Sequence, residues 1–156
     1  MVAANLGRMA EQGAGADASL LSGFDWMLSC TEEFDSTVAF VRDILGLIIA
    51  RQGIAQTDSH FSRYACAELP DGGTLEIVEP SQAAGPLRGR QILCLRVPDL
   101  LEARAELERR GAVLASDVFV EGDGLGWIYV QAPAGNVYQI YGPVTRPGTS
   151  SPANGG

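Results

Sequence analysis

Residues 70–80 read PDGGTLEIVEP, and residues 133–143 read PAGNVYQIYGP. The two stretches share one plan, because each is a Pro/Gly turn followed by an alternating strand and a closing proline. The separation is constant at 63 residues, from 70 to 133 at the start and from 80 to 143 at the end. Repetition at a fixed separation indicates a single domain built from two similar halves. We expect a functional site on the surface that such halves share.

The sequence around each repeat predicts the same order of elements in both halves. In the first half, Thr31 and the acidic residues after it start a helix that Gly46 ends. One apolar face of this helix has helical spacing: Phe34, Val38, Val41 and Leu45. Strands are expected at about 26–30, 48–52, 60–69 and 74–78.

In the second half, Asp99 and Glu102 resemble a capping box that opens a helix ending at Gly111. Strands are expected at about 92–97, 113–120, 127–132 and 137–141. Both halves therefore read βαβββ. We expect a single domain over 24–143, with modules at about 24–80 and 90–143. Residues 1–23 are rich in Ala and Gly and predict a flexible arm, and 144–156 predict a disordered tail.

Composition excludes several classes of partner. The net charge is −8 without any basic cluster, which argues against nucleic acid and acidic membrane surfaces. No apolar run approaches the roughly 20 residues that span a bilayer, and the N-terminus does not have the pattern of a signal peptide. The three cysteines lie in apolar strand patterns, which favours free thiols in a reducing cytoplasm. All eleven basic residues are arginine, which together with the Ala and Gly content suggests a GC-rich bacterium such as an actinobacterium.

Two motifs carry a family resemblance. Residues 40–47, FVRDILGL, are similar to the "FYrdvLGL" text of the vicinal oxygen chelate superfamily, and 133–136, PAGN, to its "DPdGn" turn. This superfamily includes glyoxalase I, extradiol dioxygenases, methylmalonyl-CoA epimerase, fosfomycin resistance enzymes and bleomycin resistance proteins. The resemblance covers about 25–143 and implies an α+β fold in which two βαβββ modules form a cupped mixed sheet.

The resemblance also implies where a metal would bind. Metal-using members carry ligands on the first and last strand of each half, which here fall at Trp26, Glu76, Ile92 (or Gln91) and Gln139. Only Glu76 is a good ligand, and one carboxylate with a glutamine does not hold a divalent transition metal tightly. We therefore expect no metal and no other cofactor.

Strand alternation predicts what lines the cupped face instead. If Glu76 and Gln139 face the cavity, Leu75, Ile77, Tyr138 and Ile140 pack on the helices. The expected ligand-binding residues are Trp26, Leu28, Cys30, Tyr64, Glu76, Ile92, Arg96, Trp127, Tyr129, Gln139 and Tyr141. Flat aromatic walls with few charges suit a sizeable, planar, partly apolar ligand.

Several of these residues can also serve the fold instead of binding a ligand. Trp26 and Trp127 can be core residues, and Glu76 can pair with Arg96 across the cavity. The single histidine, His60, is interpreted as a solvated residue at the rim in preference to a general base. The cysteines are expected to fill space in the core, because none has the neighbouring His or Lys of a nucleophile.

Two functions are consistent with these features of the sequence. The first is a metal-free protein of the bleomycin resistance type, in which a homodimer sequesters an aromatic natural product or antibiotic. The second is a metal-independent cyclase or isomerase that acts on a polyketide-like or peptide-like substrate. In that enzyme Glu76 is the acid or base, and Gln139, Tyr141 or Arg96 stabilises an oxyanion.

Overall fold

The computed structural model describes residues 19–56 and 60–145. The first module contains β1 (Gly23–Cys30), α1 (Phe34–Ala39), β2 (Ile48–Ile54), β3 (Phe61–Glu68) and β4 (Thr74–Pro80). The second contains β5 (Gln91–Arg96), α2 (Leu100–Arg109), β6 (Val113–Leu114), β7 (Phe119–Val120), β8 (Leu125–Gln131) and β9 (Val137–Pro143). The βαβββ order predicted for both halves is confirmed, except that one predicted strand of the second module is divided into β6 and β7. Residues 1–18 and 146–156 of the predicted arm and tail lie outside the described residues.

All the strands of the described chain belong to one nine-stranded mixed sheet. Its order is β2-β3-β4-β1-β5-β9-β8-β6, with β7 also paired to β8. Within each module the first strand runs parallel to the last, β1 beside β4 and β5 beside β9. The antiparallel pair β1–β5 joins the modules, with Trp26 opposite Cys94 and Leu28 opposite Ile92. The two halves therefore meet edge to edge within a single chain.

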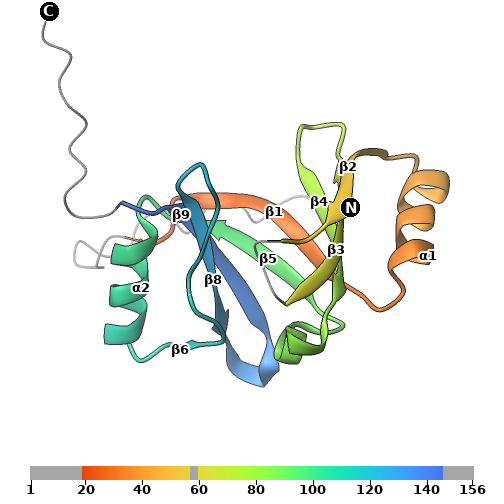
Figure 1. The fold of residues 1–156 in the computed structure, drawn as a ribbon. Helices are drawn as coiled ribbons and strands as arrows, with labels where there is room; N and C mark the ends of the chain where they lie inside the picture. The colour runs from red at the N-terminus through yellow and green to blue at the C-terminus, as the bar shows by residue number, and fades with distance from the viewer. Residues whose placement is uncertain (1–18, 57–59, 146–156) are drawn as a thin grey trace, which may run out of the picture.

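The helices α1 and α2 lie at opposite ends of the sheet, with the strands between them (Figure 1). Phe34, Val38 and Val41 pack with Ile77 of β4, and Leu100 and Ala103 pack with Ile140 of β9. A third apolar cluster, which contains Leu28, Val78, Trp127 and Tyr129, occupies the other face of these strands. The helix-facing and cavity-facing residues of β4 and β9 thus alternate as the sequence predicts.

The first helix departs from its predicted length and face. It changes to a π-helical turn at Phe40–Ile44, in which the N–H of Leu45 bonds the carbonyl of Phe40 at 3.1 Å. This wider turn rotates the residues after it, so Leu45 is 52% exposed instead of buried with Phe34 and Val38. Gly46 follows in the left-handed region, with φ of +72°, and the chain then enters β2.

The division between β6 and β7 has a local cause. The hydroxyl of Ser116 accepts a hydrogen bond from the backbone N–H of Tyr129 at 3.1 Å, in place of a strand carbonyl. The N–H of Ala115, one residue earlier, still bonds the carbonyl of Tyr129 at 2.7 Å. The chain leaves the ladder here and returns at Phe119, which lies opposite Trp127.

No helix within residues 19–56 and 60–145 is long and apolar enough to span a membrane.

Candidate ligand-binding cavity

The concave face of the sheet encloses a cavity of about 700 Å³. Its lining side chains come from both modules: β1, β2, β3 and β4 on one side, and β8, β9 and the turn between β7 and β8 on the other. One chain therefore supplies walls on both sides of the cavity, and the β1–β5 pair forms the seam between them.

Most of the predicted site residues are brought together here. Eight of the eleven line the cavity: Trp26, Leu28, Tyr64, Glu76, Trp127, Tyr129, Gln139 and Tyr141. Cys30, Ile92 and Arg96 do not. Strand alternation places these eight correctly on one face, because the β1–β4, β3–β4 and β8–β9 ladders have no irregularity at their positions.

Cys30 and Ile92 lie on the same face of the sheet as the cavity, but they do not line the cavity. Both are fully buried in a cluster with Leu87 and Val137, where the connection between the modules packs against the sheet. Strand alternation predicts which face of the sheet a side chain occupies. It does not predict that the connection between the modules covers one end of that face. Both residues are therefore core, which corrects the prediction that they contact a ligand.

Arg96 lies at the other end of β5, outside the cavity lining. Its Nη2 is 3.4 Å from Oδ1 of Asp25, and half of the side chain is exposed. Arg96 is therefore paired with Asp25, which corrects the suggested pairing with Glu76 across the cavity. The cation that lines the cavity is instead Arg51 of β2, which lies opposite Cys66.

The aromatic walls contain ring contacts that connect distant strands. The rings of Trp26 and Tyr141 meet edge to face, with centroids 4.7 Å apart. Phe119 stacks on Trp127 at 5.9 Å with an interplanar angle of 20°. One face of Trp127 is thus covered by its own chain, and the residue also lines the cavity.

His60 contacts this aromatic set and is half-buried, so it is less solvated than expected of a rim residue. Its ring lies 5.4 Å from Phe119 and 5.7 Å from Tyr129, in edge-to-face geometry with both. Phe119 itself was not among the predicted site residues. A hairpin centred on the glycine-rich turn at 122–126 would have placed Phe119 opposite Trp127, and this was the available signal.

The two polar positions on the last strands have different neighbours. Gln139 is 3% exposed, and its Oε1 accepts a hydrogen bond from the Cys94 thiol at 3.2 Å. Burial, followed by the nearby carboxylates of Glu76 and Asp25, raises the pKa of Cys94, so this thiol stays protonated and donates. The bond holds the Gln139 amide in one orientation at the cavity wall.

Glu76 lies opposite Cys66 on one side and beside Leu28 on the other. The Arg51 Nη2 lies 3.9 Å from the Cys66 sulfur. Burial and the charge of Glu76 raise the pKa of Cys66, whereas Arg51 lowers it. Cys66 is therefore a neutral wall residue and not an activated nucleophile.

The donor set does not fit the metal that the fold family often uses. The ladder places Leu28 beside Glu76 and Cys94 beside Gln139, whereas counting along the sequence placed Trp26 and Ile92 at the corresponding positions. Neither set supplies the imidazole and carboxylate ligands that divalent iron, manganese or zinc requires. Within the described residues, no group of three His, Cys, Asp or Glu side chains is placed to hold a metal ion.

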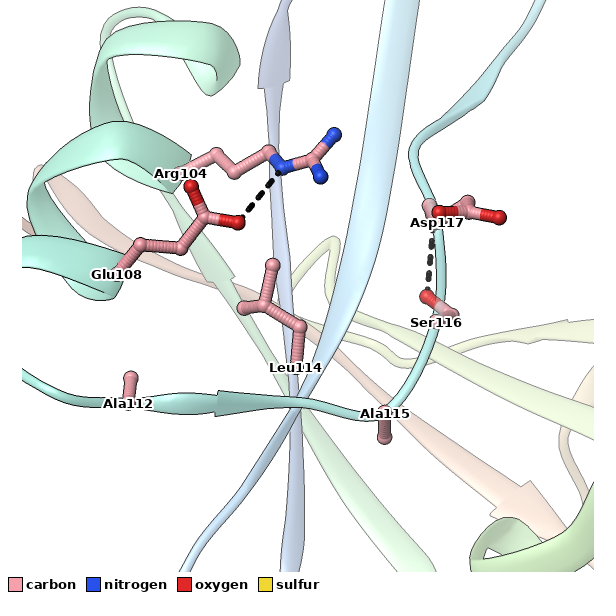
Figure 2. Close-up of a pocket in the computed structure, with 7 residues that line it drawn as sticks. All are labelled: Arg104, Glu108, Ala112, Leu114, Ala115, Ser116 and Asp117. Carbon is pink, nitrogen blue, oxygen red and sulfur yellow. Dashed lines mark hydrogen bonds and ion pairs between the residues drawn. The ribbon is translucent and has the colours of Figure 1, made fainter.

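A second hollow of about 490 Å³ lies between α2 and the β6 region (Figure 2). Arg104 and Glu108 of α2 face Ser116 and Asp117 across it, and Arg104 is already paired with Glu108 at 3.4 Å. Its described walls contain no aromatic side chain. The aromatic cavity is therefore the better candidate for a binding site.

Comparison with known proteins gives the family. Residues 23–140 match the model of the Glyoxalase/Bleomycin resistance protein/Dioxygenase superfamily. No curated protein matches the sequence significantly.

Among solved structures, methylmalonyl-CoA epimerase from Mycobacterium tuberculosis superposes with a TM-score of 0.63 at 20% identity, covering 83% of this chain and 93% of that one. A Streptomyces coelicolor methylmalonyl-CoA epimerase variant, in complex with 2-nitronate-propionyl-CoA, gives 0.60 at 18% identity and covers 80% and 99%. A hypothetical protein from Bacillus halodurans gives 0.60 at 14% identity and covers 79% and 95%. These likenesses show a shared fold, and with the match over residues 23–140 the chain belongs to the glyoxalase/bleomycin resistance protein/dioxygenase superfamily.

Proposed function

We propose that this protein binds and sequesters an aromatic natural product or antibiotic without a metal, as a self-resistance protein does. The observation that carries the proposal is the cavity: four aromatic residues of β1, β8 and β9 line it, and only one of the family's four metal positions, Glu76, holds a good ligand. Burying planar apolar area against such walls supplies binding free energy without any chemical step. Lowering the free concentration of a toxic compound requires only affinity.

An aromatic probe tests this proposal directly. Acridine should quench the fluorescence of Trp26 and Trp127, which both line the cavity. Trp127→Ala should weaken binding by about 2 kcal/mol, as loss of a buried aromatic anchor does, and Trp127→Phe should retain most of the affinity. Failure of acridine and related tricyclic compounds to bind would contradict the proposal.

A second candidate is a metal-independent cyclase or isomerase, and the position of Glu76 favours it. The carboxylate lies in the cavity wall, close enough for its charge to raise the pKa of both Cys66 and Cys94. A carboxylate in an aromatic-walled cavity can exchange a proton with a bound substrate, while the Gln139 amide is held at the same wall.

Glu76→Gln separates the two candidates, because it keeps the shape and removes proton transfer. A sequestering protein should retain most of its affinity, whereas an acid/base enzyme should lose on the order of 10²-fold or more in rate. The measurement is mass spectrometry of small molecules from the producing organism after incubation with either protein. A compound altered by the wild type and unaltered by Glu76→Gln would establish the enzyme.

We also propose that the protein works as a cytoplasmic homodimer. The three cysteines are free and buried, which suits a reducing compartment. Apolar side chains are exposed on the outer face of the central strands, with Phe24 at 56%, Leu93 at 40% and Met27 at 37%. Met27 and Leu93 lie opposite each other on the β1–β5 pair, so they form one continuous patch that a second copy would cover.

A further inference from the structure

We infer that the cavity selects ligands that carry an organic cation, such as an amine or amidine, held against the turn between β7 and β8. The inference rests on the proposed binding function and adds the chemical class of the ligand. It is carried by the charges of the cavity walls. Three carboxylates line the cavity, those of Glu76, Glu121 and Asp123, against the single cation Arg51.

The acidic turn is fixed in position by its own backbone. The N–H of Glu121 bonds the carbonyl of Leu125 at 2.7 Å, and that of Gly124 bonds the carbonyl of Glu121 at 3.1 Å. Oδ1 of Asp123 accepts a hydrogen bond from the N–H of Leu125 at 3.0 Å. The backbone of the turn and the Asp123 carboxylate are therefore held in place before a ligand arrives, which lowers the entropy cost of binding.

No cation of the described chain forms an ion pair with this turn. Among residues 19–56 and 60–145, neither Glu121 nor Asp123 forms an ion pair, and Arg96 is engaged with Asp25. The chain contains no lysine that could serve. Two uncompensated carboxylates beside an apolar cavity leave room for a cation that the ligand brings.

Aromatic rings complete the environment. Trp26 and Tyr141 line the same cavity and meet edge to face at 4.7 Å. Burial and then the charges of Asp123, Asp25 and Glu121 raise the pKa of the Tyr141 phenol, whereas Arg96 lowers it, so the carboxylates outweigh this cation at the ring. Indole and phenol rings attract an organic cation through their π electrons, and nearby carboxylates add to that attraction. A ligand with a flat apolar body and a cationic group would satisfy the aromatic walls and the turn together.

Three probes that share one tricyclic ring test the inference. At slightly alkaline pH, 9-aminoacridine is a cation, acridine is neutral and acridine-9-carboxylate is an anion. We expect the cation to bind at least tenfold more tightly than acridine, and the anion to bind least, as measured by quenching of tryptophan fluorescence. Equal affinities, or preference for the anion, would overturn the cation preference and leave the binding function intact. Absence of binding by all three probes overturns both.

A matched pair of double variants locates the effect. Glu121→Gln with Asp123→Asn removes two charges and keeps an oxygen acceptor for the Leu125 N–H. Glu102→Gln with Asp117→Asn removes two charges from the second module outside the cavity. We expect the first pair to lower the affinity for 9-aminoacridine about tenfold without changing that for acridine, and the second pair to change neither. An equal loss of affinity for 9-aminoacridine in both double variants would show that only the net charge matters. It would contradict the placement of the ligand's cation at the turn between β7 and β8.

Discussion

Arg63 connects two carboxylates from different elements of the first module. Its guanidinium donates to Asp35 of α1 at 2.9 Å and to Glu79 of β4 at 2.8 Å, and it lies 4.4 Å from the centroid of the Phe34 ring. Hydrogen bonds from Arg63 and then from Ser62 lower the pKa of Glu79 to about 2. The helix is thereby tied to the sheet on the outer face, away from the cavity.

The lowered pKa predicts a pH dependence of stability. A carboxylate with a depressed pKa in the folded state stabilises the fold above its ordinary value of 4.5, and this contribution is lost as the pH falls toward 2. The wild type should therefore be more stable than Glu79→Gln at neutral pH, and the difference should shrink between these values. Urea unfolding at a series of pH values measures it, with Glu68→Gln on the same sheet as a control. A difference that stays constant down to pH 2 would contradict the role of Glu79.

For single residues, the sequence predicts the face of the sheet on which a side chain lies better than it predicts the neighbours of that side chain. Alternation assigned Glu76, Gln139 and Tyr141 to the cavity correctly, because a regular strand has a period of two residues. It did not predict that Ile92 lies beneath a packed connection, or that Arg96 turns to Asp25. Those outcomes depend on which segments meet in three dimensions.

At the scale of elements, the break between β6 and β7 shapes the second module. The Ser116 hydroxyl takes the place of a backbone carbonyl as the acceptor for the N–H of Tyr129. The chain pairs with β8 again at β7, where Phe119 stacks on Trp127. The first module has the unbroken strand β2 at the corresponding place. The sequence predicted one strand here, since neither glycine nor proline marks the interruption at 115–118.

Removal of the Ser116 hydroxyl tests the cause of this break. Ser116→Ala removes the acceptor of the Tyr129 N–H, which should cost about 1–3 kcal/mol of unfolding free energy. Ser116→Thr keeps a hydroxyl and should be close to wild type. Chemical denaturation followed by tryptophan emission measures both. Equal stability of the alanine variant and wild type would show that the hydroxyl does not hold the break.

For the whole molecule, the repeat at 70–80 and 133–143 predicted the architecture, because each copy becomes the last strand of a module. The sequence left open whether the cavity is closed by one chain or by two. The β1–β5 pair answers this, since residues of both modules line one cavity. The proposed dimer would therefore cover apolar surface and would not be required to complete the site.

The proposed dimer gives a prediction of mass. Light scattering at micromolar concentration should give twice the chain mass of 16.5 kDa. Met27→Glu with Leu93→Glu places like charges in the outer patch and should give the monomer, with acridine binding retained because the cavity lies on the other face. A wild-type monomer would refute the dimer.

The proposed function requires that each chain binds a planar aromatic ligand without a metal. Calorimetric titration of 9-aminoacridine into chelator-treated protein is the sharpest test of this requirement. We predict one molecule bound per chain, with an affinity that added divalent iron, manganese or zinc does not change. Binding that appears only after metal is added, or one molecule bound per two chains, would be incompatible with the proposed function.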